Sequence, residues 1–285
     1  MSRTNQVTTY QDYQYEDSPD FVKLIKNEPL QFDDTPRVLL LDGDSLLFQV
    51  IYFPLDGLIQ FDTDEEYIEE AKHRLREKVQ EITINIEKWF NIKQTLIFQG
   101  GKNNFRYRLS NTYKSNRPKE KPKYFTEIKE YAKEIGFITC NGHEADDAIY
   151  QCYLTSNKQC VISAIDKDIL AHCCCVPIYD FKIRKEVIGE FKYTTETQAR
   201  LAQATQYLIG DSGDGVGGAR GVGKKYAEQH LHETMTNYQF IKAILNGYIK
   251  STKDVREAKK QMKLTYNLLR LYTIDEINSL NLDKI

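Results

Sequence analysis

The sequence predicts an α/β fold in which helices flank a mostly parallel central sheet. Three short apolar runs indicate buried strands, at residues 37–41 (RVLLL), 95–98 (TLIF) and 161–165 (VISAI). Segments with the apolar spacing of helices separate them, and such alternation is typical of a parallel sheet covered on both faces. Acidic residues directly follow the first and third runs. Because the carboxyl ends of parallel strands share one edge of a sheet, we expect these carboxylates to lie close together.

The composition is that of a globular protein without a membrane segment. The chain has 285 residues, 41% hydrophobic and 28% charged, which allows one large domain or one large and one small domain. No apolar run approaches the roughly 18 residues of a membrane span, and the polar N-terminus lacks the apolar part of a signal peptide. We therefore expect a cytoplasmic protein with no membrane partner. Three consecutive cysteines at 173–175 suit neither a disulfide framework nor a zinc site, so we expect reduced thiols at a strand edge.

The first strand leads into an acidic turn and a helix. Residues 1–36 are polar, and Pro29 and Pro36 limit any long helix there, so we treat them as an N-terminal extension. The strand at 37–41 ends at the sequence DGDS, after which the apolar residues within 46–51 indicate a helix. Residues 67–90 have helical apolar spacing, which predicts a long helix packed on the core.

A basic segment follows the second strand. Residues 102–123 contain eight lysines and arginines and a single acid, Glu120. A solvated surface would explain this, but Phe105, Tyr107 and Tyr113 are interleaved with the cations. Basic side chains contact phosphates and aromatic rings stack on bases, so this composition is typical of a segment that binds single-stranded nucleic acid.

A cluster of three carboxylates begins a later helix. Residues 125–135 indicate a helix and 137–140 a short strand, which leads to Glu144, Asp146 and Asp147. In isolation, negative charge at a helix N-terminus explains such a cluster, at about 0.3–1 kcal/mol per charge. The other acidic strand ends favour a second explanation, because carboxylates gathered at one edge repel one another unless a divalent cation binds them.

A glycine-rich turn connects two helices near the C-terminus. Residues 201–209 indicate a helix that ends at the stretch 210–225, whose first half carries two acids three positions apart. Its second half could bring backbone N–H groups close to a phosphate, and it ends in two lysines that favour a phosphodiester backbone. Residues 226–231 and most of the chain from 236 onward indicate supporting helices.

Five motifs in this order resemble those of the 5′-nuclease superfamily, which contains phage 5′–3′ exonucleases, flap endonucleases and the 5′-nuclease domain of bacterial DNA polymerase I. They are LLLDGDSLLFQ, TYKSNRPKEKP, GHEADDAIYQC, SAIDKDIL and LIGDSGDGVGGARGVGKKYA, within residues 37–232. The resemblance implies a PIN/Rossmann-like nuclease domain over residues 37–200. It further implies a helix–three-turn–helix DNA-binding region with supporting helices over residues 201–285.

The resemblance also implies a role for individual residues. Two Mg²⁺ or Mn²⁺ ions would be held by Asp42, Glu144, Asp146, Asp147, Asp166, Asp168, Asp211 and Asp214. Catalysis would rest on Lys114, Arg117, Asp42 and Asp146. The side chains of Lys114 and Arg117 would face the scissile phosphate. DNA contacts would come from Arg106, Tyr113, Lys114, Arg117, Gly221, Gly223, Lys224 and Lys225, with K⁺ as a further ion at the turn. In this scheme Tyr113 could stack on an unpaired base.

The implied function is a metal-dependent 5′–3′ exonuclease and flap endonuclease. Its substrates would be DNA with 5′ ends or flaps and, during primer removal, the RNA of RNA–DNA hybrids. The context would be phage-type replication or repair in a bacterial host cell, with replication proteins as further partners.

Two departures from the family pattern leave alternatives open. Family members carry an aspartate just after the second strand, where this chain has Gln99 and two glycines. Asp44 could compensate, or the chain could be a catalytically attenuated, structure-selective DNA-binding homologue. The segment between Arg117 and Glu144 is also short for a full helical arch. A third hypothesis, a haloacid-dehalogenase-like phosphatase using Asp42 as phosphoryl acceptor, leaves most of the motifs without a role.

Overall fold

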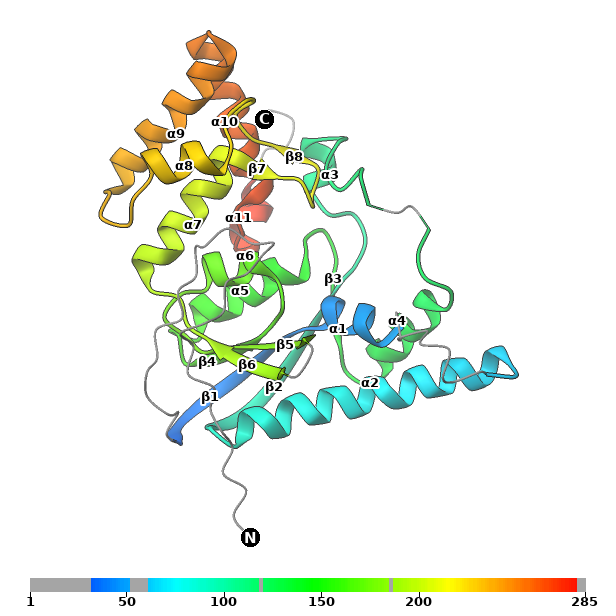
Figure 1. The fold of residues 1–285 in the computed structure, drawn as a ribbon. Helices are drawn as coiled ribbons and strands as arrows, with labels where there is room; N and C mark the ends of the chain where they lie inside the picture. The colour runs from blue at the N-terminus through cyan, green and yellow to red at the C-terminus, as the bar shows by residue number, and fades with distance from the viewer. Residues whose placement is uncertain (1–31, 52–60, 118–119, 185–186, 281–285) are drawn as a thin grey trace.

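The computed structural model describes residues 32–51, 61–117, 120–184 and 187–280 (Figure 1). Most of the predicted N-terminal extension, residues 1–31, lies outside these ranges. A central sheet with helices on both sides forms one part, and a cluster of helices from the C-terminal third lies above it (Figure 1). The predicted helical character of the chain after residue 236 is confirmed.

The central sheet has six strands and is parallel except at one edge. In spatial order the strands are β3 (Ile138–Cys140), β2 (Phe90–Gly100), β1 (Asp33–Asp42), β4 (Cys160–Ser163), β5 (Ile178–Arg184) and β6 (Val187–Lys192). Only the pairing of β5 with β6 is antiparallel. The predicted α/β fold with a mostly parallel sheet is therefore confirmed, and the predicted strands correspond to β1, β2, β3 and β4.

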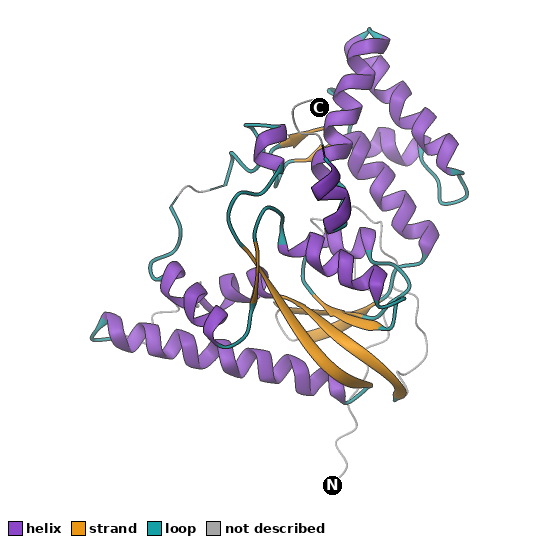
Figure 2. Cartoon of the chain, turned by 180° about the vertical axis from the view of Figure 1, so that it is seen from behind, coloured by secondary structure: helices purple, strands orange, loops and turns teal. Residues whose placement is uncertain are grey.

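Helices cover both faces of this sheet (Figure 2). Leu39 and Leu41 of β1 pack in one core with helices α1 (Gly43–Ile51), α2 (Asp64–Glu87) and α4 (Phe125–Glu134). Leu40 belongs to a second core with helices α5 (Ala145–Thr155) and α6 (Lys167–His172). Side chains alternate between the faces of a strand, so three consecutive leucines serve both cores.

A third core holds the C-terminal part together. It is formed mainly by helices α7 (Glu196–Ile209), α8 (Lys224–His230), α9 (Asn237–Thr252) and α10 (Val255–Leu269). A short pair of strands, β7 (Gly210–Asp211) and β8 (Val216–Gly217), lies in the glycine-rich stretch between α7 and α8. The remaining helices are α3 (Arg106–Leu109), in the basic segment, and α11 (Ile274–Ser279).

Several boundaries differ from the prediction for local reasons. The long helix begins at Asp64 because the Thr63 hydroxyl caps it by accepting a hydrogen bond from Glu66 N at 3.2 Å. It ends before Phe90, which instead begins β2. The β5–β6 hairpin and the short helix α6 were not predicted. The three consecutive cysteines lie between α6 and β5, and all six cysteines are free thiols.

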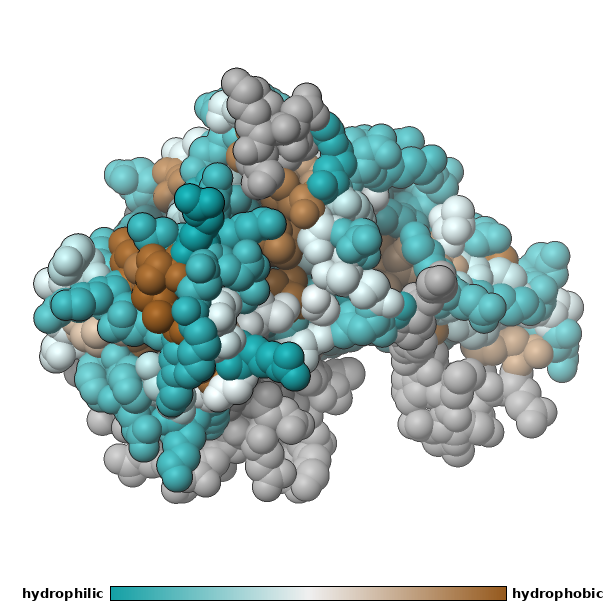
Figure 3. Space-filling view, turned by 90° about the horizontal axis from the view of Figure 1, so that it is seen from above, coloured by the Kyte–Doolittle hydropathy of each residue, from teal (hydrophilic) through white to brown (hydrophobic). Residues whose placement is uncertain are grey.

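One face of the molecule is mainly hydrophilic. The face seen from above in Figure 3 is mostly polar, with smaller hydrophobic patches between the polar side chains. Among the described residues, every helix is too short or too polar to cross a membrane.

Candidate active site

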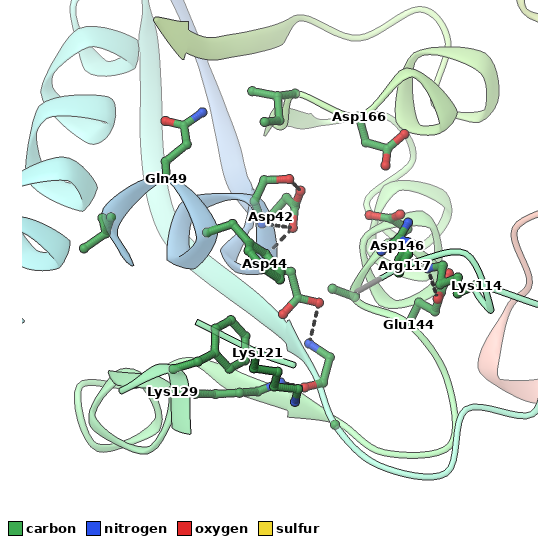
Figure 4. Close-up of a pocket in the computed structure, with 18 of the residues that line it drawn as sticks. Asp42, Asp44, Gln49, Lys114, Arg117, Lys121, Lys129, Glu144, Asp146 and Asp166 are labelled. Carbon is green, nitrogen blue, oxygen red and sulfur yellow. Dashed lines mark hydrogen bonds and ion pairs between the residues drawn. The ribbon is translucent and has the colours of Figure 1, made fainter. Parts of the chain in front are cut away.

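A cavity of about 1050 Å³ opens at the carboxyl edge of the sheet (Figure 4). Its walls come from β1, α1, α2, the end of β2, the basic segment, α4 and the start of α5. We call it the acidic pocket, because its lining includes seven carboxylates, those of Asp42, Asp44, Glu144, Asp146 and Asp166, and those of Glu77 and Glu81 on α2. Four cations line it as well on the side of the basic segment and α4, Lys114, Arg117, Lys121 and Lys129. The convergence of strand ends that the sequence predicted is therefore present.

Asp42 is fixed by the turn that follows β1. Its Oδ1 accepts hydrogen bonds from Asp44 N at 3.1 Å and Ser45 N at 3.2 Å, and its Oδ2 accepts one from the Ser45 hydroxyl. Burial, and next the Asp44 carboxylate, raise the pKa of Asp42 to about 7. The turn therefore holds a carboxyl group that has a strong tendency to bind a proton or a cation.

Asp146 and Asp166 approach Asp42 from two other elements. Asp146 lies in the first turn of α5, and Asp166 caps α6 by accepting a hydrogen bond from Asp168 N at 2.8 Å. Burial raises the pKa of Asp146, and the charges of Asp166 and Asp42 add to this effect. One buried and two half-buried carboxylates thus repel one another across the acidic pocket.

A second group of acids adjoins this one. Gln206 Nε2 donates to Asp168 Oδ1 at 2.7 Å and, more weakly, to Asp211 Oδ2 at 3.4 Å. Burial raises the pKa of Asp168, as do the charges of Asp166 and Asp211. Asp211 also contacts the Lys167 ammonium at 2.8 Å, which lowers its pKa against the effect of burial. The two groups therefore meet at Asp166.

The predicted cations Lys114 and Arg117 reach the acidic residues. The Lys114 ammonium contacts the Glu144 carboxylate and lies 3.9 Å from Asp214 Oδ2. Arg117 Nη2 lies 2.6 Å from Asp214 Oδ1. The backbone also joins these segments, because Lys114 N donates to Asp214 O at 2.7 Å. The basic segment and the turn after α7 are therefore clamped together beside the acidic pocket.

The structure contradicts the predicted roles of Arg106 and Asp147. Arg106 is only 1% exposed, so it cannot contact DNA. It donates to both oxygens of Asp147, at 2.6 and 2.8 Å, and to backbone carbonyls of the C-terminal part. Asp147 is 0% exposed and also accepts hydrogen bonds from Glu144 N and Tyr272 N, both at 3.0 Å. With these partners it is a structural anchor and not a metal ligand.

The structure also contradicts base stacking by Tyr113. Its side chain is 2% exposed, and its hydroxyl donates to Glu144 Oε2 at 3.1 Å and lies 3.2 Å from Asp214 Oδ2. The neighbouring Tyr107 is 55% exposed, lines the acidic pocket and packs edge-on against Tyr113, with 5.7 Å between ring centroids. Tyr107 is thus the ring of the basic segment that offers a face to a ligand. Both tyrosines lie in the same basic segment, so only their burial distinguishes them.

Gln99 does not supply an oxygen to the pocket. It is 1% exposed, and its amide donates to Thr139 Oγ1 at 3.1 Å and to Lys129 O at 3.4 Å. The next residue, Gly100, lines the acidic pocket instead. An oxygen ligand on the β2 side must therefore come from another residue.

The glycine-rich turn presents the predicted groups at the surface. Val222 is buried in the third core and anchors the turn. Gly221 has a φ of 75°, a left-handed conformation that favours glycine, and Gly223 caps α8. These two glycines and the adjoining Lys224 and Lys225 are exposed, as contact with a phosphate backbone requires.

The acidic oxygens of the pocket are held apart. In the described parts of the chain, the residues that bring three metal-binding atoms within 4.8 Å of one another are Cys174, Cys175 and Glu196, which lie elsewhere. In the pocket, the Lys114 ammonium already contacts Glu144, and the charges of Asp166 and Asp42 act on Asp146. The donors are all carboxylate oxygens, which suit a hard cation such as Mg²⁺.

Together, the fold and the pocket define an α/β protein with acidic groups and cations at the carboxyl edge of its sheet. Residues 37–200 match the sequence model of the 5′-3′ exonuclease N-terminal resolvase-like domain. This match covers more than half of the chain. The chain therefore belongs to the 5′–3′ exonuclease family, within the 5′-nuclease superfamily that the motifs predicted.

Two solved structures from bacteriophage T5 share the fold. One is a mutant of the T5 5′-exonuclease, with a TM-score of 0.56, 17% identity, and coverage of 87% of this chain and 96% of that one. The other is the T5 flap endonuclease in a pseudo-enzyme–product complex with DNA and metal ions, with a TM-score of 0.57, 18% identity and the same coverages. At this level of identity the likeness shows the fold alone.

Proposed function

We propose that this chain is a divalent-metal-dependent 5′–3′ exonuclease and flap endonuclease that hydrolyses phosphodiester bonds in DNA. The observation that carries the proposal is the acidic pocket. Asp42, Asp146 and Asp166 converge there from three elements, and Lys114 and Arg117 lie on its rim. Family membership and the fold shared with the T5 enzymes support it.

Two Mg²⁺ or Mn²⁺ ions fit the donor set of the site. The first would be held by the carboxylates that line the acidic pocket, and the second by Asp168, Asp211 and Asp214 beside it. Bound there, divalent ions would stabilise negative charge on the attacking and leaving oxygens of the phosphodiester. Lys114 and Arg117 add fixed positive charge where the phosphate gains negative charge.

The DNA-binding surface of the proposed enzyme combines three features. Arg117, which is half-exposed, and Lys114 would contact the phosphate at the pocket, and Tyr107 would stack on an unpaired base. The exposed turn at Gly221 and Gly223 would contact duplex phosphates, with K⁺ as a bound ion. We include RNA–DNA hybrids, replication proteins and a phage-type, cytoplasmic setting in the proposal on the resemblance of the motifs.

A 5′-labelled flap substrate tests the proposal. We expect short 5′ products in Mg²⁺ or Mn²⁺ and none in chelator. Asp146→Ala should abolish cleavage, because it removes a central carboxylate of the acidic pocket. Glu127→Gln, which removes an exposed acid from α4, should leave cleavage unchanged.

The second candidate is a DNA-binding homologue with attenuated catalysis. It is favoured by one observation, the absence of an acid on β2 at Gln99 and Gly100. Wild-type protein that binds the flap in Mg²⁺ and leaves it intact at high concentration would establish this candidate and overturn the first. The phosphatase hypothesis is not retained, since family membership accounts for the motifs that it leaves without a role.

A further inference from the structure

Asp44 places a carboxylate at the end of β2. It is the second residue of α1, and it lines the acidic pocket beside Asp42 (Figure 4). Its Oδ2 accepts a hydrogen bond from Gly100 N at 2.9 Å. Within the described residues, no hydrogen-bond donor reaches its Oδ1. One oxygen is therefore fixed to the strand, and the other is available to a ligand in the pocket.

Gly100 provides the space for this carboxylate. A Cβ atom on residue 100 would lie 2.7 Å from Asp44 Oδ2, closer than real Cβ contacts allow. Gly100 does not have a positive φ, so its backbone would accept another residue type. The close approach of Asp44 is therefore what requires a glycine here.

Gly43 brings the start of α1 against β2. A Cβ atom on residue 43 would lie 2.6 Å from Phe98 O and 2.9 Å from the Phe137 ring. The Lys129 ammonium contacts Gly100 O, so the end of β2 is held in place. Two glycines on different elements thus let an acid of α1 occupy the position that a side chain of residue 100 would take.

We propose that Asp44 supplies the carboxylate of the divalent-metal site on the β2 side, in place of an acid on β2 itself. The inference rests on the proposed function for the identity of the ligand. Gln99 cannot fill this role because its amide is buried against Thr139 and Lys129. The purely structural alternative is that Asp44 only braces α1 against β2 and stabilises the helix N-terminus.

Metal binding separates these two roles. We would measure Mn²⁺ affinity by electron paramagnetic resonance and the rise in melting temperature on adding Mn²⁺, for wild type, Asp44→Asn and Glu127→Gln. Asp44→Asn keeps the size of the side chain and removes its charge, so Mn²⁺ affinity should fall about tenfold or more. Glu127→Gln is the matched control, because it removes the charge of an exposed acid on α4 in the same way. This variant should bind Mn²⁺ as wild type does.

Relocating the acid gives a second, independent test. Asp44→Ala clears the space beside residue 100, so adding Gly100→Asp should restore Mn²⁺ affinity to within a few-fold of wild type. Gly100→Asp alone should lower the melting temperature, because its Cβ atom would meet Asp44 Oδ2. Wild-type Mn²⁺ affinity in Asp44→Asn, or no gain from Gly100→Asp in the Asp44→Ala background, would overturn the inference.

The outcome can be told apart from failure of the proposed function. If wild type cleaves no flap and Asp44→Asn still weakens Mn²⁺ binding, the proposed nuclease function fails and the role of Asp44 stands. If wild type cleaves the flap and Asp44→Asn binds Mn²⁺ normally, only the role of Asp44 is refuted.

Discussion

At the scale of single residues, Lys114 is both a partner for acids and a candidate for catalysis. Its ammonium contacts Glu144 and lies near Asp214. We expect Lys114→Met to lower flap cleavage by about 10²–10³-fold, because it removes positive charge at the phosphate. The same change should raise Mn²⁺ affinity, since it frees two carboxylates from a competing cation.

Single-turnover cleavage and Mn²⁺ titration of the same Lys114→Met preparation check this prediction. Lys102→Met, an exposed cation at the start of the basic segment, is the matched control and should change neither quantity by more than about twofold. A loss of Mn²⁺ affinity in Lys114→Met would show instead that Lys114 positions the ligands and does not compete with the metal.

Residue types alone could predict the acidic pocket but not every member of it. Asp42, Asp146 and Asp166 were predictable because strand ends converge in any parallel α/β sheet. The structural role of Asp147 was not predictable, because its neighbour Asp146 has the same carboxylate chemistry. Only the pairing with Arg106 distinguishes Asp147 from a pocket residue. The same limit applied to the tyrosines of the basic segment, where burial selects Tyr107 over Tyr113.

At the scale of elements, the buried Arg106–Asp147 pair joins α3 to α5. Arg106 also donates to Leu268 O at 3.0 Å, at the end of α10, so three elements meet at one guanidinium. We expect Asp147→Asn to lower the free energy of unfolding by about 3–5 kcal/mol, because it leaves a buried cation without its counter-charge. Urea unfolding of the metal-free protein measures this loss, with Lys102→Met as a control within about 0.5 kcal/mol of wild type.

A Mn²⁺ titration completes this test. An Asp147→Asn protein that remains folded at low temperature should retain the Mn²⁺ affinity of wild type, because Asp147 has no free oxygen to offer. Unchanged stability together with weakened Mn²⁺ binding would restore Asp147 to the set of metal ligands.

The elements that escaped prediction are those defined by distant partners. The sequences of β5 and β6 mix apolar and charged residues, and β6 joins the sheet only through its antiparallel pairing with β5. The strands β1, β2 and β4 were predictable because central strands buried on both faces need continuous apolar runs. A hairpin at the sheet edge does not need a continuous apolar run, so its hydrophobic pattern in the sequence is weaker.

For the whole molecule, the raised pKa of Asp42 predicts how stability depends on pH. The folded pKa is about 7 and the ordinary value is 3.8, so between these values the folded protein keeps a proton that the unfolded chain has lost. The contribution of Asp42 to the free energy of unfolding of the metal-free protein should therefore decrease by about 2–3 kcal/mol from pH ~5 to ~7, and the raised pKa values of Asp146, Asp166 and Asp168 act in the same direction. Asp147 and Asp211, whose pKa values are lowered, oppose this trend in more acidic solution, and buried His172, whose pKa is lowered to about 4, opposes it between pH ~4 and ~6.5.

Divalent metal should reverse this trend, because cations and protons compete for the same carboxylates. Urea unfolding across this pH range, with and without Mg²⁺, should show stabilisation by Mg²⁺ that grows as the pH rises. Asp42→Asn has no group to titrate at this position, so the metal-free stability of wild type relative to Asp42→Asn should fall as the pH rises from ~5 to ~7. A stability difference between wild type and Asp42→Asn that does not fall through this window would mean that Asp42 is ionised in the folded protein, and that the acidic pocket tolerates its charge without a cation.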